Sequence, residues 1–433
     1  MKDTEFARRR KILMQMVGSG GIAILPSAPI KTRSRDVEYR FRQDSDFYYL
    51  TGFEEPDSVV VMAPGRENGE YLMFCRERDV ERERWDGSRL GPDGVIEHRG
   101  ADDAFPIDDI DDILPGIMES CERVYYTMGL YPEFDTRIAD WVNSLRSRGN
   151  RGVHTPQEFV ALDHLLHDMR LYKSRAEISA MRKSAKVAVA AHTRAMQMVR
   201  PGLSEYEVEA EFIHEFRCND ARYSYSPIVA TGSNGCTLHY VDNRAQLQDG
   251  DLLLIDAGCE LDYYASDITR TFPVSGKFNP EQRAVYEIVL EAQLAAIEKM
   301  RKGNHWNEPH DAAVKVITKG LKKIGLLDGT LPKLIKDGAY QEFYMHRTGH
   351  WIGMDVHDVG DYKVGDEWRL LEPGMVATVE PGIYIPSGRK IGKAWRNIGI
   401  RIEDDVAVTS NGPDVLTKGL VKDPDEIESL MQH

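Results

Sequence analysis

Three mostly apolar runs in the second half of the chain each end in an acidic residue. Each run has the length and side chains typical of a buried strand, and the acids that end them are Asp256, Glu380 and Glu403. Glu380 and Glu403 also have the parity of an antiparallel pair joined by the loop 386–397. Burying one carboxylate costs several kcal/mol unless a positive partner compensates it. The pattern is difficult to explain as surface patterning, and it predicts carboxylates that converge on a cation.

A fourth carboxylate, Asp267, lies eleven residues after Asp256, at the start of the next apolar run. If Leu261 and Asp262 form the tip of a hairpin, Asp256 and Asp267 face each other across its strands at about 5 Å. Like charges at that distance repel, and a bound cation would remove the repulsion. The alternative is a hairpin of different register, with two separate solvated aspartates.

Histidines supply the nitrogen ligand that these carboxylates lack. His346, His350 and His357 fall within twelve positions of a poorly helical segment, and His239 follows the loop 232–235. A lone histidine beside apolar residues is more often a hydrogen-bonded core group than a ligand. The histidines on helical patterns are therefore interpreted as structural or exposed: His192, His214 and His305.

Four carboxylates with one or two imidazoles make a hard, oxygen-rich site, which suits Mn²⁺, Mg²⁺ or Co²⁺ better than structural Zn²⁺. Four carboxylates carry a charge of −4, which two divalent cations balance, whereas one cation leaves −2 in an apolar enclosure. Two metal ions about 3.5–4 Å apart ionise a bridging water, and this chemistry is metal-assisted hydrolysis. Motifs for other chemistries are absent: there is no G-x-S-x-G, no H-E-x-x-H and no G-x-x-x-x-G-K-[ST].

The composition is that of a globular protein with an acidic surface. A length of 433 residues favours two domains, and 42% hydrophobic with 29% charged residues excludes disordered and coiled-coil classes. The net charge of −15 argues against nucleic acid or an anionic membrane as a partner.

The cysteines and the apolar runs bear on location. The five cysteines include no C-x-x-C pair, which favours a reducing compartment and a cytoplasmic protein. No run approaches the ~18 apolar residues of a membrane span. Residues 8–25 loosely resemble a signal peptide, but glycines interrupt the apolar part, and a helix over 6–17 followed by a strand over 22–25 is the preferred interpretation.

The helices and strands that position the acids follow from caps and periodicity. Two capping boxes, Ser174 with Glu177 and Ser204 with Glu207, predict one helix over about 178–199 and a second helix that ends at about 219. Because these two helices follow the first α/β segment, a domain boundary is expected near residue 170. Asn279 is expected to cap another helix. In the first part, a strand at 59–63 pairs with 71–75, and the acidic stretch 102–112 is an exposed loop or helix start. Interspersed helices and hairpins predict the α+β class.

The ordered motifs resemble those of the pita-bread metallopeptidases and, within them, the aminopeptidase P subfamily of Xaa-Pro aminopeptidases. The segments that carry the resemblance are 255–258, 267–270, 349–358, 379–382 and 401–404, with 39–47 and 51–53 in the N-terminal part. The resemblance implies a creatinase-like α/β domain over 1–170 and a pita-bread catalytic domain over 171–433. It also implies hydrolysis of the N-terminal Xaa-Pro bond of peptides with proline at the second position.

The resemblance further implies which residues do the chemistry. The metal ligands would be Asp256, Asp267, His350, Glu380 and Glu403. They would hold two Mn²⁺, with Co²⁺, Zn²⁺ or Mg²⁺ as possible substitutes, and a hydroxide that bridges the two ions. Glu380 would accept the proton of the bridging water, and His357 would stabilise the oxyanion.

The remaining expected site residues contact substrate or support those that do. His346 completes the catalytic set, while His239, Tyr384 and Arg401 match substrate-site positions. Trp85 resembles a residue that one subunit lends to its neighbour's proline pocket, which implies a homodimer or homotetramer.

Four alternatives share part of this pattern. A Xaa-Pro dipeptidase (prolidase) shares all five ligands and differs at the mouth of the site. A methionyl aminopeptidase would not need ~170 N-terminal residues. A metal-free creatinase-like enzyme, or a pita-bread protein that serves only as a binding module, is expected to lack several of the carboxylates.

Overall fold

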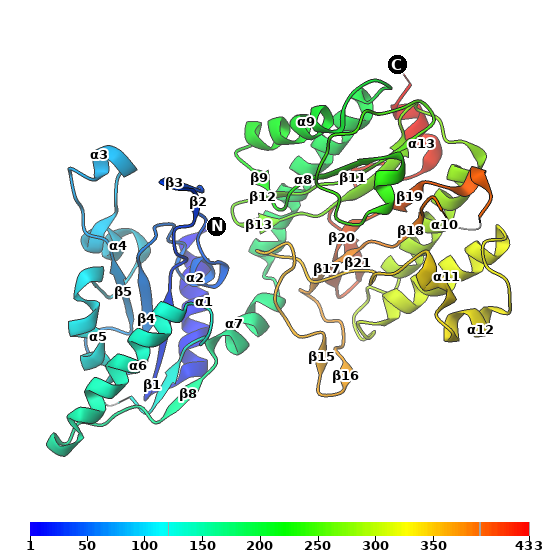
Figure 1. Cartoon of the computed structure of the whole chain (residues 1–433). Coiled ribbons are helices and arrows are strands. Elements are labelled where there is room, and N and C mark those ends of the chain that lie inside the picture. The colour runs from blue at the N-terminus through cyan, green and yellow to red at the C-terminus, as the bar shows by residue number, and fades with distance from the viewer. Residues whose placement is uncertain (120, 389–390, 433) are drawn as a thin grey trace. The chain divides into compact units, whose positions relative to one another are not determined.

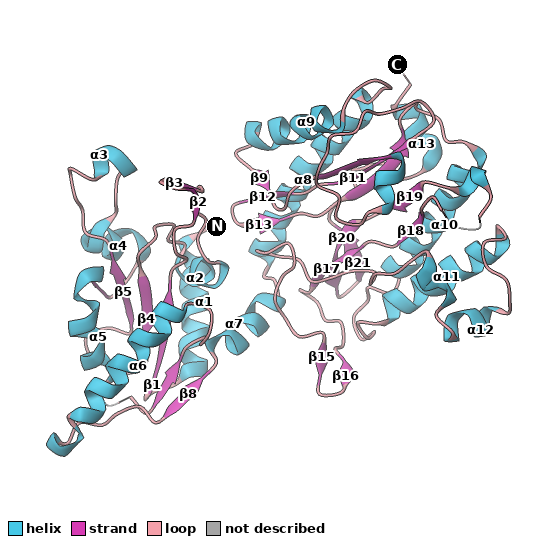
Figure 2. Cartoon of the chain, viewed as in Figure 1, coloured by secondary structure: helices cyan, strands magenta, loops and turns pink. Residues whose placement is uncertain are grey.

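The structure is a computed structural model that describes residues 1–119, 121–388 and 391–432 (Figure 1). Within it the chain forms two compact units, Met1–Met169 and Arg170–His433. Helices and strands are interspersed in both units (Figure 2), which confirms the α+β class. Among the described residues, no helix has the length and apolar character needed to cross a bilayer.

A six-stranded mixed sheet forms the centre of the first unit, in the order β6-β5-β4-β1-β7-β8. Its strands are β1 (Gly21–Pro26), β4 (Val59–Met62), β5 (Tyr71–Cys75), β6 (Asp103–Pro106), β7 (Arg123–Tyr125) and β8 (Glu158–Val160). Strands β4 and β5 pair antiparallel, with Val59 opposite Phe74, which confirms the predicted hairpin. A separate small hairpin joins β2 (Thr32–Ser34) to β3 (Val37–Glu38).

Several helices pack on this sheet. The helices of this part of the chain are α1 (Asp3–Val17), α2 (Ser45–Thr51), α3 (Glu83–Asp86), α4 (Gly91–Arg99), α5 (Ile110–Met118), α6 (Pro132–Ser147) and α7 (Leu162–Leu171). Of these, the short α3 has no buried residue and stands away from the sheet (Figure 1). Leu114 of α5 and Ile138 of α6 lie in one buried cluster with Ile24 and Val61 of the sheet. The acidic stretch 102–112 supplies strand β6 and the first turn of α5, where the helix dipole stabilises negative charge.

The helices of the second unit begin where capping residues predict them. The hydroxyl of Ser174 accepts a hydrogen bond from the backbone N–H of Glu177, and the carboxylate of Glu177 accepts one from the backbone N–H of Ser174. Helix α8 (Arg175–Met198) therefore starts with the expected capping box. Asn279 caps α10 (Pro280–Ile297). The other helices are α9 (Glu205–Cys218), α11 (Glu308–Lys323), α12 (Leu331–Lys336) and α13 (Pro424–Leu430).

Strands from distant parts of the chain form several small sheets in this unit. The three-stranded sheets have the orders β10-β11-β14, β13-β12-β9 and β17-β20-β21, and two-stranded sheets pair β18 with β19 and β15 with β16. The bounds are β9 (Arg222–Tyr223), β10 (Ile228–Thr231), β11 (Leu252–Asp256), β12 (Cys259–Leu261), β13 (Tyr264–Ala265), β14 (Thr269–Pro273), β15 (Lys363–Val364), β16 (Glu367–Trp368), β17 (Val376–Val379), β18 (Gly382–Ile385), β19 (Ile398–Arg401), β20 (Asp404–Thr409) and β21 (Gly412–Val415).

The hairpin that carries the two aspartates has a different register from the predicted one. Asp256 lies opposite Thr269, so the prediction that it faces Asp267 directly is wrong. The tip is Asp262–Tyr263, where both φ angles are positive, at 51° and 67°. Because the tip is one residue later than predicted, each pairing shifts by two residues. A two-residue shift preserves parity, so both carboxylates remain on the same face.

The second pair of acids follows the predicted parity. Gly382 of β18 lies opposite Arg401 of β19, and Val379 of β17 lies opposite Asp404 of β20. The two pairings have the same register. When either is continued toward the other, Glu380 lies opposite Glu403, in the gap between the two ladders. There the backbone N–H groups of the acids donate to other segments, that of Glu380 to Thr348 O and that of Glu403 to Thr269 O.

Candidate functional site

A cavity of about 780 Å³ in the second unit is lined by most of the site residues expected from the sequence. It is lined by all five expected metal ligands, which are Asp256, Asp267, His350, Glu380 and Glu403. It is also lined by His239, His346, His357 and Arg401. Tyr384 lies behind this lining, hydrogen-bonded to His346 and Arg401. Trp85 belongs to the first unit, where its side chain is 89% exposed.

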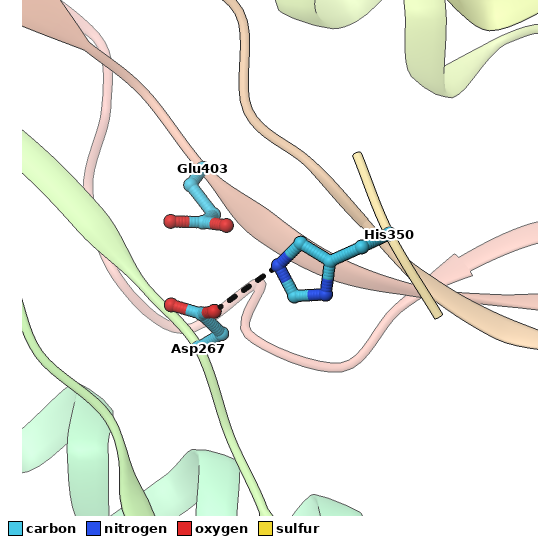
Figure 3. A group of neighbouring side chains, drawn as sticks. All are labelled: Asp267, His350 and Glu403. Atoms are coloured by element: carbon cyan, nitrogen blue, oxygen red, sulfur yellow. Dashed lines mark ion pairs between the residues drawn. The ribbon is translucent and has the colours of Figure 1, made fainter. Parts of the chain in front are cut away.

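Asp267, His350 and Glu403 form the tightest group (Figure 3), because one ligand atom from each lies within 4.8 Å of the others. His350 Nε2 is 3.5 Å from Asp267 Oδ2 and 3.7 Å from Glu380 Oε1. His350 Nδ1 lies 3.0 Å from the carbonyl oxygen of Trp351 and donates its hydrogen there. Burial opposes protonation of His350, but Asp267 and Glu380 raise its pKa to about 9, so without a cation Nε2 carries a proton toward these carboxylates. A bound cation would displace that proton, and Nε2 then has the orientation of a metal-ligating histidine.

A backbone pairing brings His350 beside Glu380. The N–H of Thr378 donates to His350 O, and the hydroxyl of Thr378 accepts from the N–H of His350. A side chain at Gly349 is excluded, since its Cβ would lie 2.0 Å from Thr378 O. Because residue 349 has no side chain, the short segment before His350 can run alongside strand β17 to the end of that strand.

Tyr225 joins the two aspartates of the hairpin, and the sequence analysis missed it. Its hydroxyl oxygen is 2.5 Å from Asp256 Oδ1 and 2.5 Å from Asp267 Oδ1. A phenol has one hydrogen to donate, so the second carboxylate oxygen needs a proton or a cation of its own. Burial and the two aspartates raise the pKa of Tyr225 well above its ordinary value, so the phenol stays protonated. No local pattern around 222–226 marks this residue.

The four carboxyl groups resist simultaneous ionisation in the absence of a cation. Burial raises the pKa of Glu403 well above its ordinary value, and Asp267 and Glu380 raise it further. Burial also raises the pKa values of Glu380 and Asp256. For Asp267, burial opposes ionisation, but the contact with His350 lowers the pKa. Divalent cations would relieve this crowding, so the donor set fits metal ions.

The side chain of Arg401 connects several residues of the site by hydrogen bonds. Its guanidinium donates from Nη2 to Asp256 Oδ2 at 2.6 Å and from Nη1 to the Tyr384 hydroxyl at 2.9 Å. Its Nε donates to the hydroxyl of Thr269, which in turn donates to Glu403 Oε2 at 2.6 Å. Thr269 is a second residue that the sequence analysis did not identify.

The three remaining histidines of the cavity differ in how they are held. His346 Nε2 lies 2.9 Å from the Tyr384 hydroxyl, and Nδ1 lies 2.7 Å from the Arg347 carbonyl oxygen. Burial lowers the pKa of His346 to about 3, so the ring is neutral. By contrast, His357 and His239 form no hydrogen bond with any described residue, and both are exposed. The ring of His357 packs edge-on against His350, with centroids 4.3 Å apart.

A buried charge cluster anchors the segment that carries His350 and His357. Asp358 accepts hydrogen bonds from Lys173 Nζ at 2.8 Å and from Arg170 Nη2 at 2.6 Å. The side chains of all three are at most 3% exposed. The anchor lies within unit 2 and lines no part of the cavity.

Comparison with known families gives two matches that together cover most of the chain. Residues 179–410 match the model of metallopeptidase family M24. Residues 6–125 match the model of the aminopeptidase P N-terminal domain.

Individual proteins are similar over nearly the full length. The Xaa-Pro aminopeptidase of Escherichia coli is 44% identical over 429 residues, which cover 99% of this chain and 97% of that protein. The structure of Pseudomonas aeruginosa aminopeptidase PepP is 60% identical with a TM-score of 0.99, covering 100% of this chain and 98% of that one. A zinc-substituted E. coli aminopeptidase P in complex with product is 43% identical with a TM-score of 0.97, at the same coverage.

Proposed function

Since the chain belongs to metallopeptidase family M24, we infer that it is a Xaa-Pro aminopeptidase, an exopeptidase that hydrolyses the N-terminal Xaa-Pro bond of peptides. The observation that carries this inference is the convergence of all five expected ligands on one cavity. The N-terminal match at 6–125 supports the subfamily, because it covers the part that a shorter M24 enzyme would not need. The intact ligand set speaks against a binding module without catalytic activity.

We propose that Asp256, Asp267, His350, Glu380 and Glu403 hold two divalent cations, Mn²⁺ by preference. Carboxylate oxygens with a single imidazole suit that metal, and Co²⁺, Zn²⁺ or Mg²⁺ could substitute for it. Two such cations would supply a water of lowered pKa and would polarise the substrate carbonyl. Tyr225 and Arg401 position this ligand set, since one joins Asp256 to Asp267 and the other anchors Asp256.

The chain's own groups supply proton transfer and oxyanion stabilisation in this proposal. Glu380 accepts the proton of the attacking water at a carboxylate oxygen, and it lines the cavity 3.7 Å from His350 Nε2. His357 has ring nitrogens without a described partner and can donate a hydrogen bond to the carbonyl oxygen. Both nitrogens of His346 already have partners, so we assign it to positioning Tyr384 and Arg401. His239 is left free to contact the peptide.

The main competing function is that of a Xaa-Pro dipeptidase, which must close its site behind the proline carboxylate. We expect Xaa-Pro-Yaa tripeptides to be cleaved with kcat/KM at least about tenfold above Xaa-Pro dipeptides, a difference of roughly 1.4 kcal/mol. The measurement is a panel of Ala-Pro, Ala-Pro-Ala and Ala-Ala-Ala with chelator-treated protein, before and after addition of Mn²⁺.

Ala-Ala-Ala is the control for proline specificity, because an alanine methyl does not fill a pocket shaped for a pyrrolidine ring. Activity should be lost on chelation and return with Mn²⁺. A higher kcat/KM for the free dipeptide under Mn²⁺ would identify a prolidase. Cleavage that persists after complete metal removal would contradict a metallopeptidase of any specificity.

We also propose a homo-oligomer in which Trp85 reaches the substrate of a neighbouring subunit. Its support is the 89% exposure of this large aromatic side chain on helix α3, which is unusual for tryptophan without a partner. A cytoplasmic location is likewise proposed, and the five free cysteines support it.

Trp85→Ala should raise KM about three- to tenfold with unchanged metal content, since aromatic contacts are worth about 0.5–1.5 kcal/mol beyond their buried area. Steady-state kinetics, metal analysis and sedimentation measure these effects. Met128→Ala is the control, because Met128 is also exposed in the first unit, at 60%. A fully active monomer would refute the role in trans.

A further inference from the structure

Arg347 is a cation of the cavity wall that the proposed chemistry does not use. Its side chain is exposed and lines the cavity that holds the metal ligands. Its guanidinium lies over the ring of Trp368, 5.1 Å from the centroid. Among the described residues, no carboxylate forms an ion pair with it. The other arginine of this wall, Arg401, is committed to Asp256, Tyr384 and Thr269.

This arrangement is built to accept an anion. A guanidinium over an aromatic ring is favoured electrostatically, and the side chain of Arg347 has no hydrogen-bond partner among the described residues. Its N–H groups can therefore meet a planar, bidentate partner. A carboxylate is the partner that fits this fork. The nearby acids Asp361, Asp366 and Glu367 flank Trp368 on the same chain segment, but none comes within ion-pair distance of Arg347.

The position of Arg347 indicates which part of a peptide would meet it. An exopeptidase cleaves next to the amino terminus, so the reacting bond lies at the buried ligands, where Glu403 is 2% exposed. The rest of the peptide must extend toward solvent, and Arg347 lies on the exposed part of the wall. The cationic α-amine is repelled by a guanidinium, whereas groups beyond the proline can carry a negative charge.

We propose that Arg347, oriented by Trp368, forms a subsite for a carboxylate that follows the proline of the substrate. The carboxylate can be the C-terminus of a tripeptide or the side chain of an acidic residue after proline. This subsite rests on the proposed function, because it assigns a preference within Xaa-Pro cleavage. It makes the enzyme selective for acidic peptides or for short ones.

The test compares matched peptides on the metal-loaded enzyme. Ala-Pro-Glu-amide against Ala-Pro-Gln-amide reports on a side-chain carboxylate, and Ala-Pro-Ala against its amide reports on the C-terminal one. We expect kcat/KM to be about tenfold higher for the charged member of at least one pair, mainly through KM. In Arg347→Gln that ratio should fall to within about twofold, and Arg347→Lys should restore part of it.

Lys363→Gln is the matched control. Lys363 also lies over the ring of Trp368, with Nζ 4.8 Å from the centroid, but it does not line the cavity. This variant should keep the wild-type ratio. Because each ratio is measured within one variant, a general loss of activity cancels.

Equal kcat/KM within both pairs for the wild type would overturn the subsite, and so would a ratio that survives Arg347→Gln. Calorimetric binding of Pro-Glu-amide and Pro-Gln-amide gives the same comparison without turnover. A protein that cleaves no Xaa-Pro peptide would contradict the proposed function, while the binding comparison would still decide the subsite.

Discussion

Glu403→Gln should lower kcat/KM by roughly a thousandfold or more, because loss of one of the carboxylates that would hold the metal ions forfeits several kcal/mol of the stabilisation they would supply. Bound metal should fall below the wild-type ratio in the same preparation. The fold should survive, since the glutamine oxygen can still accept the hydrogen bond that Thr269 donates to Glu403 at 2.6 Å. Kinetics and metal analysis on matched preparations measure both effects.

The same substitution should leave the metal-free protein as stable as the wild type or more stable. Burial and neighbouring acids raise the pKa of Glu403 well above its ordinary value, so ionising this carboxyl costs more free energy in the folded state than in the unfolded one. Glutamine removes that cost. The gain in free energy of unfolding should vanish below about pH 4, where the unfolded state is also protonated. Thermal unfolding of chelated protein across pH measures the difference.

Asp256→Asn is the informative companion to that variant. It should also abolish activity and reduce bound metal, but it should not stabilise the metal-free protein. Asp256 pairs with Arg401 at 2.6 Å, so neutralising the aspartate leaves a buried guanidinium without its partner. Either variant retaining most of its activity at sub-stoichiometric metal would refute the assigned centre.

Asp358→Asn should destabilise the second unit by about 3–5 kcal/mol, because it leaves the buried Lys173 without its anion and leaves Arg170 paired with the partly exposed Asp355. Lys173 and Arg170 both donate to Asp358, and their side chains are 1% and 3% exposed. Denaturant unfolding of the full chain should show a lower midpoint with an unchanged slope. His350 and His357 lie on the anchored segment, so metal affinity should fall with stability.

The pH dependence of this effect separates charge loss from packing loss. Burial favours the neutral form of Asp358, but Lys173 and Arg170 lower its pKa below the ordinary value. Its stabilising contribution is therefore complete above the unfolded pKa near 4 and is lost as the pH falls toward the folded value. The difference between wild type and Asp358→Asn should shrink over that window.

Asp355→Asn is the control for the charge cluster. Asp355 also accepts from Arg170, at 2.7 Å, but its side chain is 36% exposed. Solvent screens such a pair, so this variant should cost no more than about 1 kcal/mol. An equal loss in both variants, or no loss in Asp358→Asn, would show that the buried cluster does not anchor the segment.

Local patterns in the sequence were sufficient for much of the architecture. The capping residues Ser174 and Asn279 marked the starts of two long helices, because a cap acts on the N–H groups of its own first turn. The acids Asp256, Glu380 and Glu403 were recognisable because each ended an apolar run. Parity alone placed Glu380 opposite Glu403, since side chains alternate strictly along a strand.

The register of the first hairpin could not be predicted from such local patterns. The tip of the first hairpin falls at Asp262 and Tyr263, one residue later than predicted, because tyrosine there adopts a positive φ that its type rarely shows. Asp256 consequently faces Thr269 rather than Asp267. The shared face survived the error only because the pairing moved by an even number of residues.

What joins the acids into one centre was decided by tertiary structure alone. Tyr225 reaches Asp256 and Asp267, and Arg401 reaches Asp256 from 145 residues away in sequence. Such contacts depend on how separate sheets and segments pack, which no local periodicity encodes. The sequence by itself determined which acids and histidines were available and on which side of each strand they lie. Packing decided which charged side chains form ion pairs. It also decided which of them, like that of Arg347, have no ion-pair partner among the described residues, because desolvation and charge pairing depend on all surrounding segments at once.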